Sequence, residues 1–241
     1  MASTAESGHA KNVSNFQVLI EFVTGYGATY NPSKNILKLP QLLTLKSTAE
    51  EALSDVLKKN TNYNTKVNER SESFSGLKGL STRLVNALAT TEASTATMND
   101  AKGFNRKMQG KRASSTQSPI DPQAEAPKSI STSQQSYDQL IEHFSGLKSV
   151  LEQEPSYTPN ETDLKLATVQ ATIAKLKLKN KEVAKAYTSV SNARISRDEV
   201  LYQSENSIAE TAAEVKKYVK SVFGATSPQF KQISGIKFTK K

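Results

Sequence analysis

Cysteine and tryptophan are absent from this chain, and histidine occurs only twice among its 241 residues. Without cysteine there can be no disulfide, no thiolate nucleophile and no cysteine metal site. His9 falls in a small, polar stretch, and His143 directly follows Glu142, so those two side chains would point different ways on a helix. A Ser-His-Asp triad and a di-iron bundle are therefore disfavoured. The sequence predicts no catalytic residue, no cofactor and no metal.

Long apolar runs are also lacking, since none approaches the roughly 20 residues that a transmembrane helix needs. The first residues have no apolar core of the kind found in signal peptides, and no glycine-rich loop suits a phosphate group. From these features we expect a cytoplasmic protein without a membrane span. The redox compartment stays open, because a chain without cysteine suits either side of a membrane.

Charge is present in excess of one sign, with 32 Lys and Arg against 23 Asp and Glu, a net charge of +9. The positive charge is spread along the chain, which fits a solvated surface better than a dedicated nucleic-acid face. Even the densest group, the lysines of residues 175–185, would be distributed around a helix. Nucleic-acid binding is thus the weaker alternative to a protein partner.

The chain contains a pattern of residues that occurs twice. A turn with Tyr30, Pro32 and Lys38 returns as Tyr157, Pro159 and Lys165, and further residues match upstream and downstream in the same order. The additional matched pairs are Glu21 with Glu142, Tyr63 with Tyr187, Asn68 with Asn192, and Arg70 with Arg194. Several matches in one order predict an internal duplication.

Apolar residues recur at steps of three and four along most of the chain, which is typical of helices with one buried stripe. We therefore predict an all-α fold built as a tandem duplication of an elongated three-helix unit. The predicted organisation is a disordered N-terminus (1–13), repeat 1 (14–104), a flexible Ser/Pro/Gln-rich linker (105–133), repeat 2 (134–224) and a basic tail (225–241).

Several helix ends can be placed from the sequence. The second helix either begins near Leu39 or begins at Ser33 and bends at Pro40, because proline interrupts a helix interior. In repeat 2, Asn160 is expected to cap the middle helix. The last helix is expected to begin at residues 196–199, which have the form of a capping box, and to end at Gly224.

The middle helix of repeat 2 shows the clearest periodicity, with a seam like that of a coiled coil. Its members are Leu166, Val169, Ile173, Leu176, Asn180, Val183, Tyr187 and Val190. Asn180 is the polar residue within this seam. It either specifies how the helices are oriented or fills a hydrated gap.

The matched polar residues allow two interpretations. They could form an ionic site present twice, in which Glu21 or Glu142 meets Arg70 or Arg194. Alternatively, Asn68 and Arg70 cap the corner between the second and third helices. Along a continuous helix Arg70 would lie roughly 50 Å from the turn, whereas Glu21 would lie only about 15 Å from it. This difference favours the structural interpretation.

The most favoured function is a non-catalytic helical scaffold or protein-interaction module. The alternative is a nucleic-acid-associated basic helical protein, whose binding would weaken with salt. An enzyme with an unrecognised site is the third possibility, which a pocket with convergent carboxylates would favour. The sequence does not predict an oligomeric state.

Overall fold

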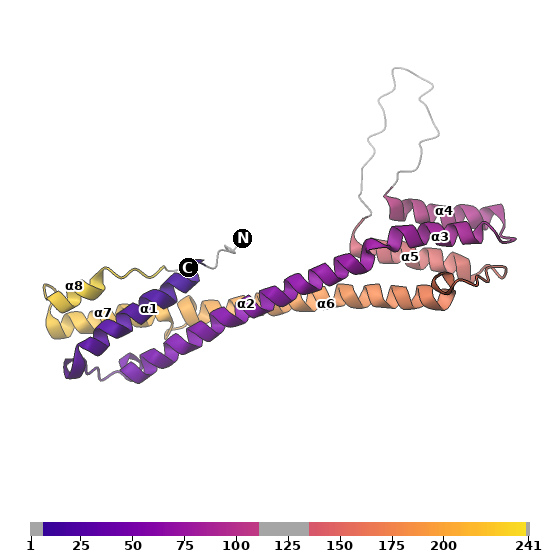
Figure 1. Cartoon of the computed structure of the whole chain (residues 1–241). Coiled ribbons are helices and arrows are strands. Elements are labelled where there is room, and N and C mark those ends of the chain that lie inside the picture. The colour runs from indigo at the N-terminus through magenta and orange to yellow at the C-terminus, as the bar shows by residue number, and fades with distance from the viewer. Residues whose placement is uncertain (1–6, 111–134, 240–241) are drawn as a thin grey trace, which may run out of the picture. The chain divides into compact units, whose positions relative to one another are not determined.

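The computed structural model of the protein describes residues 7–110 and 135–239. Across these two ranges the chain is helical and forms no β-strand, which confirms the predicted all-α class. Figure 1 labels the α-helices, which are α1 (Ser7–Gly25), α2 (Leu39–Ser75), α3 (Leu77–Leu88), α4 (Thr95–Gln109), α5 (Tyr137–Glu152), α6 (Leu166–Asp198), α7 (Ile208–Phe223) and α8 (Pro228–Ser234). Short turns are η1 (Gly27–Thr29), η2 (Asn35–Leu37), η3 (Thr162–Leu164) and the π-helical η4 (Glu199–Gln203).

The chain forms two compact units whose boundaries differ from the predicted ones. Unit 1 combines Met1–Tyr63 with Ala186–Lys241, and unit 2 is Asn64–Lys185. Each unit therefore takes segments from both predicted repeats, and the helices α2 and α6 each contribute to both units. The duplication of the sequence itself stays a prediction.

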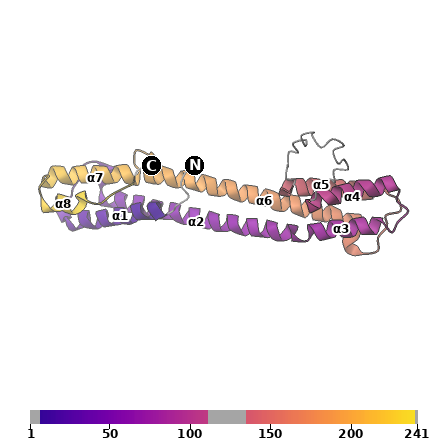
Figure 2. The same cartoon turned by 90° about the horizontal axis from the view of Figure 1, so that it is seen from above.

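In unit 1, α1 packs against α7 and α8, and η2 also contacts α7. Figures 1 and 2 both show α1, α7 and α8 side by side. The buried apolar side chains come from the 3–4 stripe of α1, from α7, and from the parts of α2 and η4 that pack against them. They include Phe16, Leu19, Ile20, Val23, Leu42, Leu201, Ile208, Val215 and Val219.

In unit 2, α4 packs against α5 and α3, and α3 also contacts α5 and η3. The core includes Leu84, Leu88, Met108, Phe144, Leu147, Leu151, Val169 and Leu176. The packing of α5 and η3 on α3 corresponds to that of α1 and η2 on α7. Helices with matching positions in the predicted repeats thus have matching neighbours in the two units.

The beginning of the chain corrects one prediction. Residues 7–13, expected to be disordered, form the first turns of α1, because His9, Asn12 and Val13 are buried. The following helix, α2, begins at Leu39, so the first of the two predicted alternatives is correct. Pro40 is then its second residue, in the first turn, where a missing N–H costs no intrahelical bond.

Two helices were not predicted. Residues 105–109 of the expected linker belong to α4, which Ser94 caps by accepting a bond from the Thr97 amide. Gly110 closes α4 in the left-handed conformation, with φ of 74°. Residues 111–133 of the expected linker lie outside the described residues. In the expected basic tail, residues 228–234 form α8, which Ser227 caps.

Two predicted caps are wrong. Asn160 caps no α-helix, because η3 intervenes and α6 begins only at Leu166. The supposed capping box at residues 196–199 lies at the end of α6, which continues because Arg197 is buried there. Ser207 is the actual cap of α7, accepting a bond from the Glu210 amide. The predicted end of that helix at Gly224, with φ of 89°, is correct.

Within the described ranges, no helix combines the length and the apolar content needed to cross a membrane.

Candidate functional site

The two matched tyrosines make the same hydrogen bond in their respective units. The hydroxyl of Tyr30 donates to the Leu37 carbonyl at 2.7 Å, and that of Tyr157 donates to the Leu164 carbonyl at 3.0 Å. Both rings are buried, so each tyrosine ties its turn to the short η helix that precedes α2 or α6.

The other residues of these turns are less enclosed. Pro32 is buried and Pro159 is half-buried, while Lys38 and Lys165 are exposed. The carbonyls of both lysines accept the first amide bonds of the helix that follows, so it is their backbone that the two turns use in the same way.

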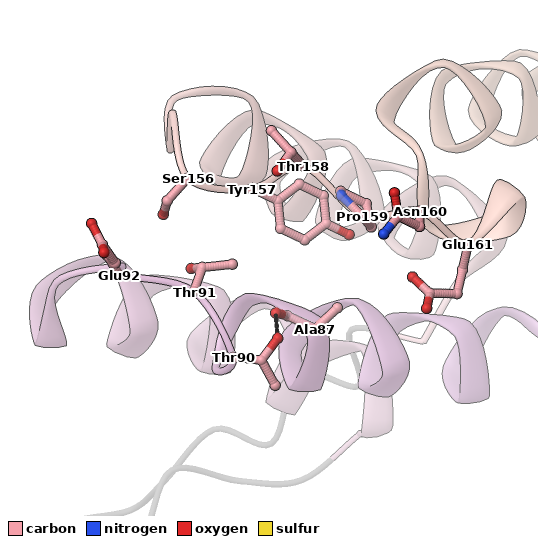
Figure 3. Close-up of a pocket in the computed structure, with 10 residues that line it drawn as sticks. All are labelled: Ala87, Thr90, Thr91, Glu92, Ser156, Tyr157, Thr158, Pro159, Asn160 and Glu161. Atoms are coloured by element: carbon pink, nitrogen blue, oxygen red, sulfur yellow. Dashed lines mark hydrogen bonds between the residues drawn. The ribbon is translucent and has the colours of Figure 1, made fainter.

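A polar hollow of about 430 Å³ lies beside Tyr157 in unit 2. Figure 3 shows it between the residues that follow α3 and the turn that precedes η3. Its lining residues are Ala87, Thr90, Thr91, Glu92, Ser156, Tyr157, Thr158, Pro159, Asn160 and Glu161. Glu92 and Glu161 stand at opposite ends of the hollow in this view, so the two carboxylates do not converge as a general acid and base would.

Burial raises the pKa of Tyr157 to about 12, and the nearby carboxylates Glu161 and Asp163 add to the effect. Burial likewise raises the pKa of Tyr30, with Tyr218 as the second cause. Both tyrosines are therefore neutral donors at physiological pH, which is the state that their hydrogen bonds to carbonyl groups require.

We expect Tyr157→Phe to lower the free energy of unfolding by about 1 kcal/mol at neutral pH, because the buried Leu164 carbonyl loses its donor. An unfolded tyrosine ionises near pH 10. The folded protein keeps Tyr157 protonated to a higher pH than the unfolded chain does. The stabilisation that results is fully present below pH 10 and is lost as the pH rises to about 12. The free energies of unfolding of the wild type and of Tyr157→Phe, measured with urea, should therefore differ less at pH 11 than at pH 9. The control is Tyr187→Phe, whose ring is 61% exposed; an equal effect there would contradict this assignment.

Arg70 and Asn180 belong to one polar cluster in unit 2. The Arg70 guanidinium donates to the Asn180 side-chain oxygen at 2.9 Å and lies 4.1 Å from the centre of the Tyr137 ring. The Asn180 amide nitrogen donates in turn to Asp138. Asn180 therefore connects α2 with α5, as a residue that specifies helix orientation would.

This geometry rules out the predicted corner cap. Asn68 and Arg70 lie inside α2, which continues to Ser75, and Asn68 is exposed. The alternative ionic site is not formed at Arg70 either, because its partners are Asn180 and Tyr137. Glu21 is exposed and accepts a hydrogen bond from Gln17 on its own helix, and Glu142 is also exposed.

The remaining matched residues lie on α2 and α6. The rings of Tyr63 and Tyr187 pack with centres 6.0 Å apart in unit 1. Asn192 is exposed and Arg194 is half-buried on α6.

A ring of four alternating charges in unit 2 was missed by the sequence analysis. Glu69 pairs with Lys66 at 3.0 Å and with Lys179 at 2.6 Å, and Glu182 pairs with the same two lysines at 3.7 and 3.0 Å. The hydrogen bonds that Glu69 accepts from Lys179 and Lys66 lower the pKa of Glu69, and the bonds that Lys179 donates to Glu69 and Glu182 raise the pKa of Lys179. The signal in the sequence was the spacing of three between opposite charges on each helix.

Helix α2 leaves an apolar stripe exposed in unit 1. Leu43 is 50% and Leu57 is 67% exposed, and Leu53 between them is half-buried. A groove of about 600 Å³ runs beside the stripe, with α1 as its other wall. Its lining residues are Ala10, Val13, Ser14, Gln17, Lys46, Glu50 and Leu53.

Both histidines are buried in helices. His9, predicted to be in a disordered stretch, lies 2.7 Å through Nδ1 from the Tyr202 hydroxyl. Burial lowers the pKa of His143, with the charge of Lys107 as a second cause. Among the described residues, no group of three His, Asp or Glu side chains is arranged to hold a metal ion.

Comparison with known proteins gives no match to any family, curated protein or solved structure. The functional argument therefore rests on the geometry of this chain.

Proposed function

We propose that this protein is a non-catalytic interaction scaffold, and that the groove between α1 and α2 receives an amphipathic helix of a partner protein. The observation that supports this proposal is the exposed stripe on α2. Leu43, Lys46, Glu50, Leu53 and Leu57 follow one another at steps of three and four, which places them on one face of the helix.

The stripe has the form of a helix-docking surface. Partner helices that lie in grooves are recognised by anchors at such helical spacing. Burying one large apolar side chain is worth roughly 1.5–3 kcal/mol, so covering Leu53 and Leu57 would supply much of the free energy of binding.

The charges within the stripe define the partner further. Lys46 and Glu50 form an ion pair at 3.0 Å in the middle of the groove. A partner helix with one acidic and one basic residue between its apolar positions would extend this pair. This is the expected chemistry of the occupant.

Nucleic-acid association is the alternative function, and the charge ring bears on it. Lys179, a member of the densest lysine group, is already paired with Glu69 and Glu182. This pairing reduces the positive charge that α6 offers to phosphate groups, so it favours the protein partner. A cytoplasmic location is part of the same proposal.

Site-specific photo-crosslinking in cells that naturally make the protein tests the proposal. A benzophenone side chain placed at Leu57 should react with one protein, at a segment whose sequence is amphipathic with helical spacing. The same group at Asp55, on another face of α2, is the matched control and should not react with that segment. Leu53→Glu should remove the Leu57 crosslink, because it puts an unpaired charge into the groove.

Two results would contradict the proposed function. One is crosslinking from Leu57 to nucleic acid that disappears with added salt, which would favour the alternative. The other is a crosslinked segment without amphipathic periodicity, or a crosslink that survives Leu53→Glu.

A further inference from the structure

The last described residues of the chain form an extended peptide held against α1 and α7 in unit 1. The Asn12 side chain makes a reciprocal pair with Thr239, donating to its carbonyl at 2.9 Å and accepting from its amide at 3.0 Å. Asn15 donates to the Lys237 carbonyl at 2.7 Å. These two helical side chains replace the backbone partners that an extended segment would find in a sheet.

Helix α7 contributes a third side chain. The Lys216 ammonium donates to the Ile236 carbonyl and, at 3.3 Å, to the Ser234 carbonyl at the end of α8. It also lies 5.5 Å from the centre of the Phe238 ring. Burial lowers the pKa of Lys216, which agrees with an ammonium group that the peptide covers.

The side chains of the peptide alternate between protein and solvent. Ile236 and Phe238 pack against the core of unit 1, whereas Lys237 and Thr239 are exposed. The Phe238 ring meets the buried Phe16 edge to face, with centres 6.4 Å apart. This surface thus binds an apolar residue and, two positions later, an aromatic residue.

We propose that this surface of α1 and α7 is a binding site for extended peptides, which the chain's own tail occupies and a partner segment of the same chemistry can take over. The partner segment is extended, with an apolar residue at one position and an aromatic residue two positions later. The site goes beyond the proposed helix groove, because Asn12, Asn15 and Phe16 lie on another face of α1 from the groove residues Ala10 and Ser14.

Two features make the tail exchangeable. The hydrogen bonds that join Asn12, Asn15 and Lys216 to the tail all involve backbone groups of the tail, which any sequence can offer. Within residues 235–239, the described part of the exchanged segment, the side chains that enter the core cluster are Ile236 and Phe238. So few contacts make the intrinsic affinity low, and the tether compensates with an effective concentration in the millimolar range. Removing the tail should therefore uncover a site that free peptide can occupy.

The test uses a fluorescein-labelled peptide with the sequence of residues 235–241 and measures its fluorescence anisotropy. A chain that ends at Gly235 should bind it at least tenfold more tightly than the full chain does. Asn12→Leu in the shortened chain should weaken binding at least tenfold, because both bonds to Thr239 are lost. Asn68→Leu, at an exposed asparagine of α2, is the matched control and should have no effect. A peptide with alanine in place of Phe238 should also bind at least tenfold more weakly.

The proposal is overturned if the shortened chain keeps its far-UV circular dichroism and thermal transition but does not bind the peptide, or if Asn12→Leu does not weaken binding. Should the shortened chain fail to fold, the full chain with Ile236→Ala and Phe238→Ala replaces it. That variant keeps the tail backbone and should bind the peptide more tightly than wild type; equal binding would refute the site. Leu57→Glu, which alters the surface proposed to bind a partner helix, should leave peptide binding unchanged. The peptide site and the helix groove are therefore tested independently.

Discussion

Asp198→Ala is expected to lower the free energy of unfolding by about 3 kcal/mol, because it removes a partner from a buried charge. The Arg197 side chain is only 2% exposed, and its Nε and Nη2 donate to one Asp198 oxygen at 2.9 and 2.8 Å. An arginine cannot lose its proton to escape burial. Without Asp198, the guanidinium stays charged in the core of unit 1 with fewer acceptors.

The matched control is Asp163→Ala, which removes the same kind of side chain from an exposed pair. Arg83 and Asp163 are 55% and 50% exposed, and such pairs are worth less than about 1 kcal/mol. Urea unfolding followed by circular dichroism at pH 7 compares the two variants. Adding Arg197→Met to Asp198→Ala should restore most of the lost stability, since the buried charge is then gone. Equal losses for Asp198→Ala and Asp163→Ala would show that burial of Arg197 does not matter.

The fold class could be predicted from the sequence because it depends on local periodicity. The apolar residues of α1 and α5 recur at helical spacing, and the buried positions Leu19, Ile20, Val23, Phe144 and Leu147 follow it. Gly224 could be recognised as a helix end because a positive φ is closed to most other residues.

Partners distant in sequence could not be predicted. Periodicity shows that a helix has an apolar face but not which other helix covers that face. A repeat made of consecutive helices was therefore predicted, whereas α1 packs on the distant α7. The error at residues 196–199 has the same origin. Ser196 and Glu199 satisfy a local capping pattern, but Arg197 is buried and α6 continues to Asp198, where η4 follows without a break.

Among the candidate sites, too, contacts between residues close in sequence could be predicted and contacts between distant residues could not. Comparison of the two sequence patterns found Tyr30 and Tyr157, whose hydrogen bonds span a few residues each. The pair of Asn12 with Thr239 joins residues near opposite ends of the chain, and no spacing rule connects them. Asn12 was instead included in a stretch expected to be disordered. A polar residue in a helix can be recognised as part of such a site only when the structure shows which distant residues it contacts.

Gly146→Ala is expected to destabilise the protein, although alanine is the better helix former. A Cβ atom at this position of α5 would lie 2.3 Å from the Phe104 ring of α4, far inside contact distance. Moving an aromatic ring in a packed interface costs about 1–3 kcal/mol, whereas the gain in helix propensity is only about 1 kcal/mol. We therefore expect a net loss of up to about 2 kcal/mol in urea unfolding, because overpacking outweighs propensity.

Gly103→Ala is the matched control, since Gly103 also lies within a helix but has open space where its Cβ would be. This substitution should stabilise the protein by about 1 kcal/mol, so the two glycines should respond with opposite signs. In a Phe104→Leu background the penalty of Gly146→Ala should largely disappear, because the smaller side chain can move aside. If Gly146→Ala stabilised the protein as Gly103→Ala does, the close approach of α4 and α5 would not be the reason for glycine at this position.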